Sequence, residues 1–317
     1  IDTIFNDYEQ NVIQSYTLTS FLEALRLKEE TFIENCAVYD AFQKRTIRQE
    51  LDLPILIDFA TPYDGFNRSF FLQPFICALL AAVGIPSVIH GVEEVSPKKG
   101  MNTHKVLMAA NKTPLLPLNT VKSQIENPLI GWGYVDQGFF CPSLSRLLQP
   151  RIDMVKRPVL ATIEKWLQPF SAKQTICVTG FTHPPYKQKT LDIIQHANCY
   201  DQLILVRGVE GSTLLPPDRR APFITMTQNH DPDFSFISPE DCGFESNVIT
   251  DQTPEESLIK GIEGLTGKNL KIRDFLCYQV LAITQQLGLS ITLTDLTSAI
   301  HSGKGFTHWE NANLLNH

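Results

Sequence analysis

The chain has 317 residues, of which 43% are hydrophobic and 19% are charged, and its formal net charge is −7. This length and composition predict a globular protein with one large domain and a smaller one, and they exclude extended disorder. The acidic total argues weakly against a general nucleic-acid binder, although a local basic groove is compatible with it. Because the chain starts at Ile1, we expect a trimmed N-terminus.

The cysteines and the apolar runs bear on cellular location. Seven cysteines are scattered along the chain, mostly in apolar runs and without a C-x-x-C pair. This usage predicts reduced, buried thiols in a cytoplasmic protein. The longest apolar run, residues 75–85, is too short to span a bilayer, and we see no signal peptide. We therefore expect no membrane partner.

Helical periodicity dominates residues 12–50. Apolar side chains recur there every three or four positions, at Leu18, Phe21, Leu22 and Leu25. Thr31 is followed three residues later by Glu34, which is the capping-box pattern that opens a second helix.

Residues 53–91 have the pattern of a βαβ unit, with a strand over 53–59, a helix over 75–83 and a strand over 87–91. The loop over 60–69 contains Asp, Gly, Asn and Ser. A strand that feeds a helix through such a loop brings backbone N–H groups and the positive end of the helix dipole to one point, where phosphates bind. The loop has one glycine and no standard phosphate fingerprint, so its spacing alone leaves anion binding and a plain helix cap both open.

The proline-rich residues 92–170 are expected to be irregular and then helical, as a connection between two domains. The elements predicted after them are a strand over 175–179, a helix over 185–197, a strand over 203–207, a loop over 208–220 and helices over 254–265, 271–287 and 294–302. This alternation predicts an α/β fold with a mostly parallel sheet. We predict a helical domain of residues 1–50, completed by helices within about 100–170, and an α/β domain of residues 51–95 and 171–317.

The order of several short motifs resembles the anthranilate phosphoribosyltransferase family. The matching segments are 20–31 (SFLEALRLKEET, against A-L-R-x-K-G-E-T), 58–65 (against the family's Gly-rich Asp segment), 66–69 (FNRS, against F-N-x-S), 89–92 (IHGV, against K-H-G-N), Arg151 with Arg157 (against a pair of arginines six apart) and 206–211 (VRGVEG, against V-H-G-x-x-G). They cover nearly the whole chain. The resemblance implies a small helical domain and a larger α/β domain, an architecture shared with nucleoside phosphorylases.

The resemblance also implies a function. Family members bind phosphoribosyl pyrophosphate with magnesium in the cleft between the domains, and they pair through the helical domain. The resemblance therefore implies a homodimer that binds a phosphorylated ribose or nucleotide. Arg151, which matches the first of the family's paired arginines, is expected near the acceptor. The residues expected to contact the ligand are Thr61, Asp64, Gly65, Asn67, Arg68, Ser69, His90, Gly91, Lys98, Lys99, Arg207 and Glu210.

The chain departs from the family pattern where chemistry is expected. The departures are Ala60-Thr61-Pro62-Tyr63 for Gly-Thr-Gly-Gly, Ile89 and Val92 for the Lys and Asn of K-H-G-N, Thr213-Leu214 for the magnesium-holding Asp-Glu pair, and residues 96–100 for the Ser-rich K-x-G-S segment. Magnesium and a lysine neutralise the charge that develops as pyrophosphate leaves, a contribution of roughly several kcal/mol. We therefore predict a divergent branch, in which anthranilate transfer and a magnesium site are both disfavoured.

Each candidate also has a plain structural interpretation, which the residues alone leave open. These are a helix cap for 67–69, a backbone-bonded strand-end histidine for His90, a solvated pair for Lys98 and Lys99, a domain-linking salt bridge for Arg151, a surface ion-pair network for Arg207, Glu210, Arg219 and Arg220, and turns for Asp58, Asp64 and the 229–233 segment (NHDPD).

A second hypothesis is a non-catalytic protein that binds nucleic acid or a protein partner. Its basic groove would consist of Arg68, Lys98, Lys99, Arg207, Arg219 and Arg220. A third, nucleoside phosphorolysis, would need only inorganic phosphate at the loop over 60–69.

Overall fold

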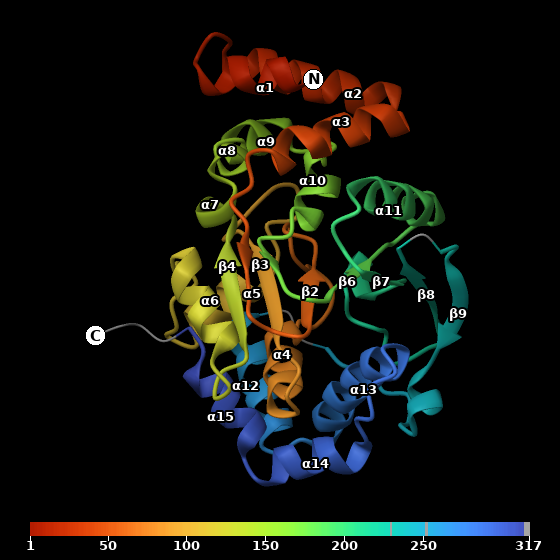
Figure 1. Cartoon of the computed structure of the whole chain (residues 1–317). Coiled ribbons are helices and arrows are strands. Elements are labelled where there is room, and N and C mark those ends of the chain that lie inside the picture. The colour runs from red at the N-terminus through yellow and green to blue at the C-terminus, as the bar shows by residue number, and fades with distance from the viewer. Residues whose placement is uncertain (229, 251–252, 314–317) are drawn as a thin grey trace.

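A seven-stranded sheet forms the centre of the computed structural model, which describes residues 1–228, 230–250 and 253–313 (Figure 1). Its strand order is β4-β3-β2-β6-β7-β8-β9. The parallel strands are β2 (Leu56–Ala60), β3 (Ser87–Gly91), β4 (Trp132–Asp136), β6 (Thr175–Gly180) and β7 (Gln202–Val206), and the antiparallel ones are β8 (Ala221–Thr227) and β9 (Asp233–Ile237). The predicted α/β fold with a mostly parallel sheet is confirmed.

Helices α1 (Asp2–Glu9), α2 (Ser15–Lys28) and α3 (Phe32–Gln43) lie together at one end of the molecule, in red in Figure 1. The predicted capping box at the start of α3 is confirmed, because the Glu34 N–H donates to Thr31 Oγ1 and the Thr31 N–H donates to Glu34 Oε2. Helix α1 lies within the predicted helical domain of residues 1–50, although the periodicity we detected begins only at residue 12.

The prediction for residues 92–170 is wrong in one respect. The segment contains the helices α5 (Thr103–Ala109), α6 (Leu118–Glu126), α7 (Gln137–Phe140), α8 (Pro142–Ser145), α9 (Leu148–Met154) and α10 (Leu160–Ile163) and the 3-10 turn η1 (Glu164–Trp166), but also the strand β4. β4 pairs in parallel with β3 and forms one edge of the sheet. A short connection to the helical end is made by β1 (Gln49–Glu50), which pairs with β5 (Phe170–Ser171).

The antiparallel edge was also missed by sequence reasoning. β8 and β9 pair from Ala221 with Ile237 to Thr225 with Asp233. The NHDPD segment lies in their connection, with a bend at His230, whose N–H donates to the Thr227 carbonyl at 3.2 Å, and with Asp233 as the first residue of β9, while residue 229 lies outside the described residues. The described part of this segment is not grouped with other side chains as metal ligands.

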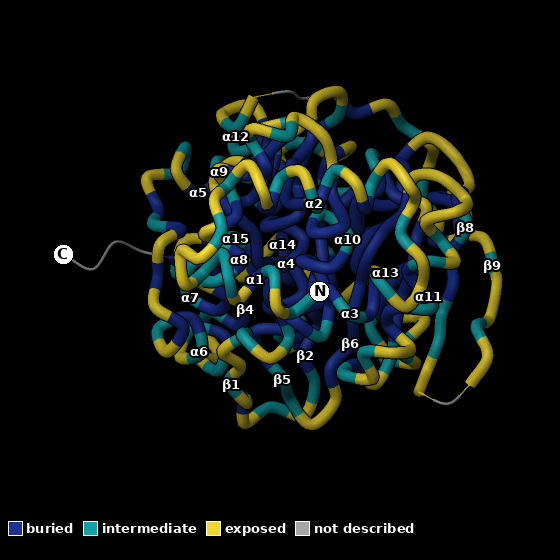
Figure 2. The backbone as a smooth tube through the Cα atoms, turned by 90° about the horizontal axis from the view of Figure 1, so that it is seen from above, coloured by how far each residue is buried: buried dark blue, intermediate teal, exposed yellow. Residues whose placement is uncertain are grey.

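Helices cover both faces of the parallel part of the sheet, so that β2, β3 and β6 are buried on both sides, whereas the antiparallel edge strand β9 is mostly exposed. One face packs against α4 (Gln73–Ala82), α12 (Pro254–Leu265), α13 (Leu270–Gln286), α14 (Leu293–His301) and α15 (Lys304–Asn311), and the other packs against α11 (Pro184–Ala197) and the N-terminal helices. Figure 2 shows α4 and the central strands in dark blue, with the edge strand β9 mostly in yellow. Among the described residues, none of the helices combines the length and apolar character needed to cross a lipid bilayer.

The parallel strands bring distant loops to one edge of the sheet. Because parallel strands end at the same edge, the loops after β2, β3 and β7 meet there, at residues 61–72, 92–102 and 207–220. These loops contain most of the candidate residues.

Candidate functional site

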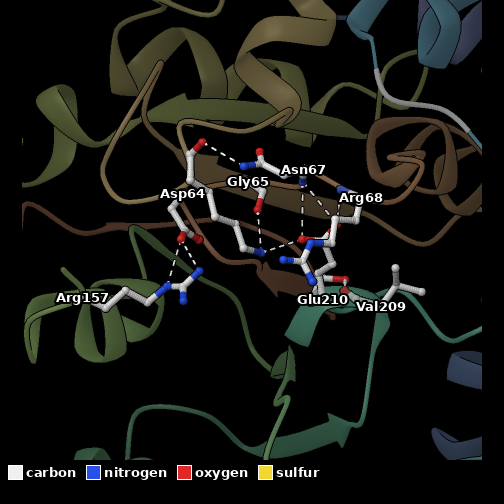
Figure 3. Close-up of polar contacts among 9 residues, drawn as sticks. Asp64, Gly65, Asn67, Arg68, Arg157, Val209 and Glu210 are labelled. Carbon is white, nitrogen blue, oxygen red and sulfur yellow. Dashed lines mark hydrogen bonds and ion pairs between the residues drawn. The ribbon is translucent and has the colours of Figure 1, made fainter. Parts of the chain in front are cut away.

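Three hydrogen-bond donors from two loops converge on one carboxylate. The backbone N–H of Arg68 donates to Glu210 Oε1 at 2.8 Å, the N–H of Asn67 donates to the same oxygen at 3.2 Å, and Lys98 Nζ lies 2.8 Å from Glu210 Oε2 (Figure 3). We call the two N–H groups and the Lys98 amine the anion site. In this structure its ligand is the protein's own Glu210, which comes from the loop after β7.

The two loops that carry the donors are locked together. The Asn67 side chain donates to the Lys98 carbonyl at 3.1 Å, the Gly100 N–H donates to the Asp64 carbonyl at 2.8 Å, and Lys98 Nζ also donates to the Gly65 carbonyl at 3.1 Å. Gly65 has a φ of 73°, and a Cβ there would lie 2.5 Å from the Met101 carbonyl oxygen. Only glycine permits this approach of the two backbones, which fixes the donors in place.

Glu210 is held in an unusual conformation. Its φ of 50° and ψ of 24° fall in the left-handed region, which non-glycine residues rarely adopt. Burial raises the pKa of the Glu210 carboxyl, but the bonds from Lys98 and the two N–H groups outweigh burial and leave this pKa below its usual value. Glu210 is therefore an anion at neutral pH.

Asp64, also predicted as a ligand contact, forms an ion pair. Arg157 Nε lies 2.9 Å from Asp64 Oδ2, and Arg157 Nη2 approaches the same oxygen (Figure 3). The carboxylate is 5% exposed, whereas the Arg157 side chain is 49% exposed. Arg157 thus covers Asp64 at the rim of the site, a role that the motif comparison did not assign to it.

His90 lies in a buried chain of hydrogen bonds. Its Nε2 is 3.0 Å from Asp58 Oδ1, its Nδ1 bonds the Tyr63 hydroxyl, and Tyr200 donates to the other Asp58 oxygen at 2.9 Å. Because a carboxylate oxygen accepts hydrogen bonds, His90 Nε2 donates to Asp58, and the Tyr63 hydroxyl lies between His90 Nδ1 and the Glu164 carbonyl oxygen, to which it donates at 3.3 Å. Burial raises the pKa of the Tyr63 hydroxyl well above its ordinary value, which keeps it a donor. The chain anchors Tyr63 inward.

Tyr63 fills the space beside the loop over 60–69. The side chain is 2% exposed and packs with Val92 and Val95. Beside it remains a cavity of about 10 Å³, lined by Tyr63, His90, Thr61, Gly91 and neighbours from three segments. That is about the room of one water molecule, so Thr61 and Gly91 face a space too small for a phosphate.

Arg151 is completely buried, in an ion pair with Glu164. Its Nη1 and Nη2 lie 2.5 and 2.9 Å from the two carboxylate oxygens, and both side chains are at most 1% exposed. The structure therefore does not bring Arg151 to the anion site. Arg151 is in a salt bridge, as its structural alternative proposed, but the partner Glu164 lies only thirteen residues along the chain, within the same predicted helical part, so the bridge is local and does not link the two predicted domains.

The remaining candidates differ in their exposure and contacts. Ser69 is half-buried, and the exposed Lys99 pairs with Glu94 at 3.1 Å. Arg68 and Arg207 are exposed and have no ion pair with any of the residues that the structure describes. Arg68, whose backbone N–H belongs to the anion site, thus adds an exposed cation next to it in the chain, whereas Arg207 lies three residues before Glu210.

The residues present do not fit magnesium. At the positions of the family's Asp-Glu pair, Thr213 donates to the Gln73 amide and Leu214 is a buried apolar side chain. Magnesium needs carboxylate and other oxygen ligands, and the nearby carboxylates of Asp58 and Asp64 are already bonded to His90, Tyr200 and Arg157. Within the described ranges, no three His, Cys, Asp or Glu side chains are grouped as metal ligands.

Comparisons of sequence identify relatives of both known and unknown function. No protein-family model matches the chain. An uncharacterized protein of Aquifex aeolicus is 26% identical over 242 residues, covering 76% of this chain and 71% of that protein. The uncharacterized protein YbiB of Escherichia coli is 25% identical over 284 residues, with 88% and 84% covered. The anthranilate phosphoribosyltransferase of A. aeolicus is 23% identical over 253 residues, with 78% and 72% covered.

Comparison of structures decides the fold. Anthranilate phosphoribosyltransferase from Thermus thermophilus superimposes with a TM-score of 0.76 at 17% identity, over 98% of this chain and 92% of that one. The chain has the anthranilate phosphoribosyltransferase fold. The Saccharomyces cerevisiae anthranilate phosphoribosyltransferase, solved in complex with PRPP and Mg, gives a TM-score of 0.74 at 15% identity, over 93% and 84%. The resemblance drawn from the motifs is confirmed at the level of the fold.

Sequence reasoning predicted that these loops meet but missed two features of the site. It placed Glu210 on the far wall, whereas the carboxylate is bonded to the anion site itself. It gave Tyr200 no role, because nothing local marks a tyrosine 142 residues from Asp58 as its partner. The one available signal was Tyr63, whose bulk in place of glycine indicated a filled loop.

Proposed function

We propose that this chain binds a phosphorylated ribose or nucleotide, with a phosphate group held by the anion site. The observation that carries the proposal is the convergence of the Asn67 and Arg68 N–H groups and the Lys98 amine on one carboxylate. Fixed backbone N–H groups beside a lysine form a concave positive site, which suits phosphate oxygens as well as carboxylate oxygens. Arg68 and Arg207 are exposed and lie on the two loops that carry the Arg68 N–H and Glu210, so both can add positive charge for such a ligand.

The proposal is one of binding rather than of anthranilate transfer. The cavity beside Tyr63 holds about 10 Å³, and the side chains at 213 and 214 do not suit magnesium. The relatives support the scaffold as one that binds a phosphorylated ribose, since the S. cerevisiae anthranilate phosphoribosyltransferase was solved in complex with PRPP and Mg. The protein is proposed to keep a phosphate contact from that scaffold without its metal-assisted chemistry.

Calorimetric titration with ribose 5-phosphate tests the proposal. Replacing Lys98 with Met removes the cation of the anion site, and we expect affinity to fall at least tenfold, or about 1.4 kcal/mol. The matched control is Lys99→Met, because Lys99 is adjacent but pairs with Glu94 and should leave affinity within about twofold. Equal affinity in the wild type and Lys98→Met would refute the proposed site.

We further propose that the protein is a cytoplasmic homodimer paired through its helical end. Large apolar side chains are exposed on α2 and α3, with Tyr16 72%, Ile33 76% and Phe32 51% exposed. Such a patch on a folded protein is typical of a contact surface. All seven cysteines are free thiols and six are buried, which supports a reducing compartment.

Nucleic-acid binding is the second candidate, and exposed aromatic residues on β9 favour it. Phe234 and Phe236 are 56% and 57% exposed; Lys187 Nζ lies 4.9 Å from the ring centre of Phe234, and Arg220 Cζ lies 4.9 Å from that of Phe236. Aromatic rings flanked by cations stack bases in single-strand binders. Of the proposed basic groove, however, Lys98, Lys99 and Arg219 are paired with Glu210, Glu94 and Asp218.

Salt dependence tests this second candidate. Binding of single-stranded DNA through the groove should weaken steeply as salt is raised, and Phe234→Ala with Phe236→Ala should weaken it further. Undetectable binding at low salt would remove the candidate.

A further inference from the structure

The anion site already holds an anion, and that anion belongs to the protein. Glu210 accepts from the N–H groups of Asn67 and Arg68 and from Lys98, and its side chain is 13% exposed. Any external anion that uses these donors must first displace this carboxylate. The binding strength of the site therefore depends on how firmly Glu210 holds it.

The donors and the carboxylate differ in how they are fixed. The donors lie on two loops joined by backbone bonds between residues 64 and 100 and between residues 66 and 101. Glu210 lies on the loop after β7, in a left-handed backbone conformation between Gly208 and Gly211. Among the described residues, its side chain bonds only to groups of the anion site. Release of the carboxylate therefore leaves the donors in position. It also allows the Glu210 backbone to leave the left-handed conformation, which non-glycine residues rarely adopt.

The charge of an external anion determines whether it can displace the Glu210 carboxylate from the anion site. A tethered carboxylate competes at an effective concentration in the millimolar range and carries one negative charge. A carboxylate ligand or a phosphodiester also carries one charge, so the donors attract it about as strongly as they attract Glu210. A phosphate monoester carries about −1.5 to −2 at pH 7 and three acceptor oxygens, so it can satisfy all three donors at once.

We propose that Glu210 is an internal competitor at the anion site, which selects ligands ending in a phosphate monoester and rejects phosphodiesters and carboxylates. This inference rests on the proposed function, which it narrows to sugars or nucleotides with a terminal phosphate. Binding replaces the bonds from Asn67, Arg68 and Lys98 to Glu210 by bonds to the phosphate.

Titration of three proteins with two anions tests the inference. The proteins are the wild type, Glu210→Gln and the matched control Glu94→Gln, which removes the same charge from a residue that pairs with Lys99 at 3.1 Å and Lys105 at 3.5 Å. The probes are inorganic phosphate and dimethyl phosphate at pH 7.5. We expect Glu210→Gln to bind phosphate at least tenfold more tightly than the wild type, and Glu94→Gln to stay within twofold of it.

The affinities for the two probes separate the competitor role of Glu210 from the proposed phosphate binding itself. Wild-type protein should prefer phosphate to dimethyl phosphate at least tenfold, and Glu210→Gln should gain affinity for both. Glu210→Asp, which keeps the charge but shortens the reach, should also gain affinity, and its thermal unfolding reports whether the loop still folds. Equal phosphate affinity in wild type, Glu210→Gln and Glu210→Asp would refute the competitor role of Glu210 but not the anion site. Absence of phosphate binding in all three proteins would refute the proposed function as well.

Discussion

Lys165 is a buried amine without a hydrogen-bond acceptor among the residues that the structure describes. It is 8% exposed, and its Nζ lies 5.0 Å from the ring centre of Trp166. Burial lowers the pKa of the Lys165 amine from 10.5 to about 8, with partial opposition from Cys177 and Glu164. At neutral pH the protein thus keeps a poorly solvated charge.

Replacing Lys165 with Met should stabilise the protein in a pH-dependent manner. The folded-state pKa is depressed, so between pH 8 and 10.5 the unfolded chain binds more protons than the folded one, and wild-type stability rises with pH. We expect Lys165→Met to raise the free energy of unfolding at pH 7 by up to about 3 kcal/mol. The advantage should shrink to nothing near pH 10.5.

Urea unfolding of both proteins at several pH values measures this difference. Lys112, whose amine pKa burial also lowers to about 8, is the internal reference because it donates to the Glu310 and Ala312 carbonyls. Lys112→Met should destabilise, since it leaves these two acceptors unpaired. A constant difference between wild type and Lys165→Met at all pH values would contradict the assigned cause.

The pair of Arg151 and Glu164 joins α9 to η1 through the core beneath the helical end. Removing one partner leaves a buried charge uncompensated. We therefore expect Arg151→Ala to lower the free energy of unfolding by about 3–5 kcal/mol and to leave affinity for ribose 5-phosphate unchanged.

A double variant distinguishes this structural role from a role in binding. Arg151→Met combined with Glu164→Leu should recover most of the lost stability, because both charges are then gone. Thermal unfolding and titration of the same samples give both quantities. Loss of ligand affinity at unchanged stability would show that Arg151 contacts the ligand, as the motif resemblance implied.

Local signals and long-range pairing explain which elements could be predicted. Helix starts such as Thr31 with Glu34 and Thr253 with Glu256 depend on residues three apart, and both capping boxes form. β4, by contrast, is five residues with a glycine, and it is a strand because it pairs with β3. The antiparallel β8 contains Pro222 near its start, which argues against a strand in sequence reasoning.

The same distinction applies to the site. The loops meet because parallel strands end at one edge, which the βαβ pattern predicted. The partner of each side chain was not predictable, because Glu210 is 142 residues from Arg68 and Asp58 is equally far from Tyr200. Glu164, thirteen residues from Arg151, could have been suspected only from the rule that buried charges are paired.

At the scale of the whole molecule, the exposed apolar residues of the helical end should determine the oligomeric state. Ile33→Glu places a charge at a side chain that is 76% exposed on α3, so the monomer should fold while pairing is lost. Sedimentation velocity should give a dimer for the wild type and a monomer for the variant. Ile259→Glu, at a side chain 58% exposed on α12 away from that end, is the control and should remain dimeric. A monomeric wild type at micromolar concentration would contradict the proposal.

A crystal structure of the whole chain grown with ribose 5-phosphate is the most direct test of the central claim, that the loops after β2 and β3 hold a phosphate. The account predicts phosphate oxygens within hydrogen-bond distance of the Asn67 and Arg68 N–H groups and of Lys98 Nζ, with the Glu210 carboxylate displaced. A ligand bound elsewhere while Glu210 keeps all three donors would contradict it.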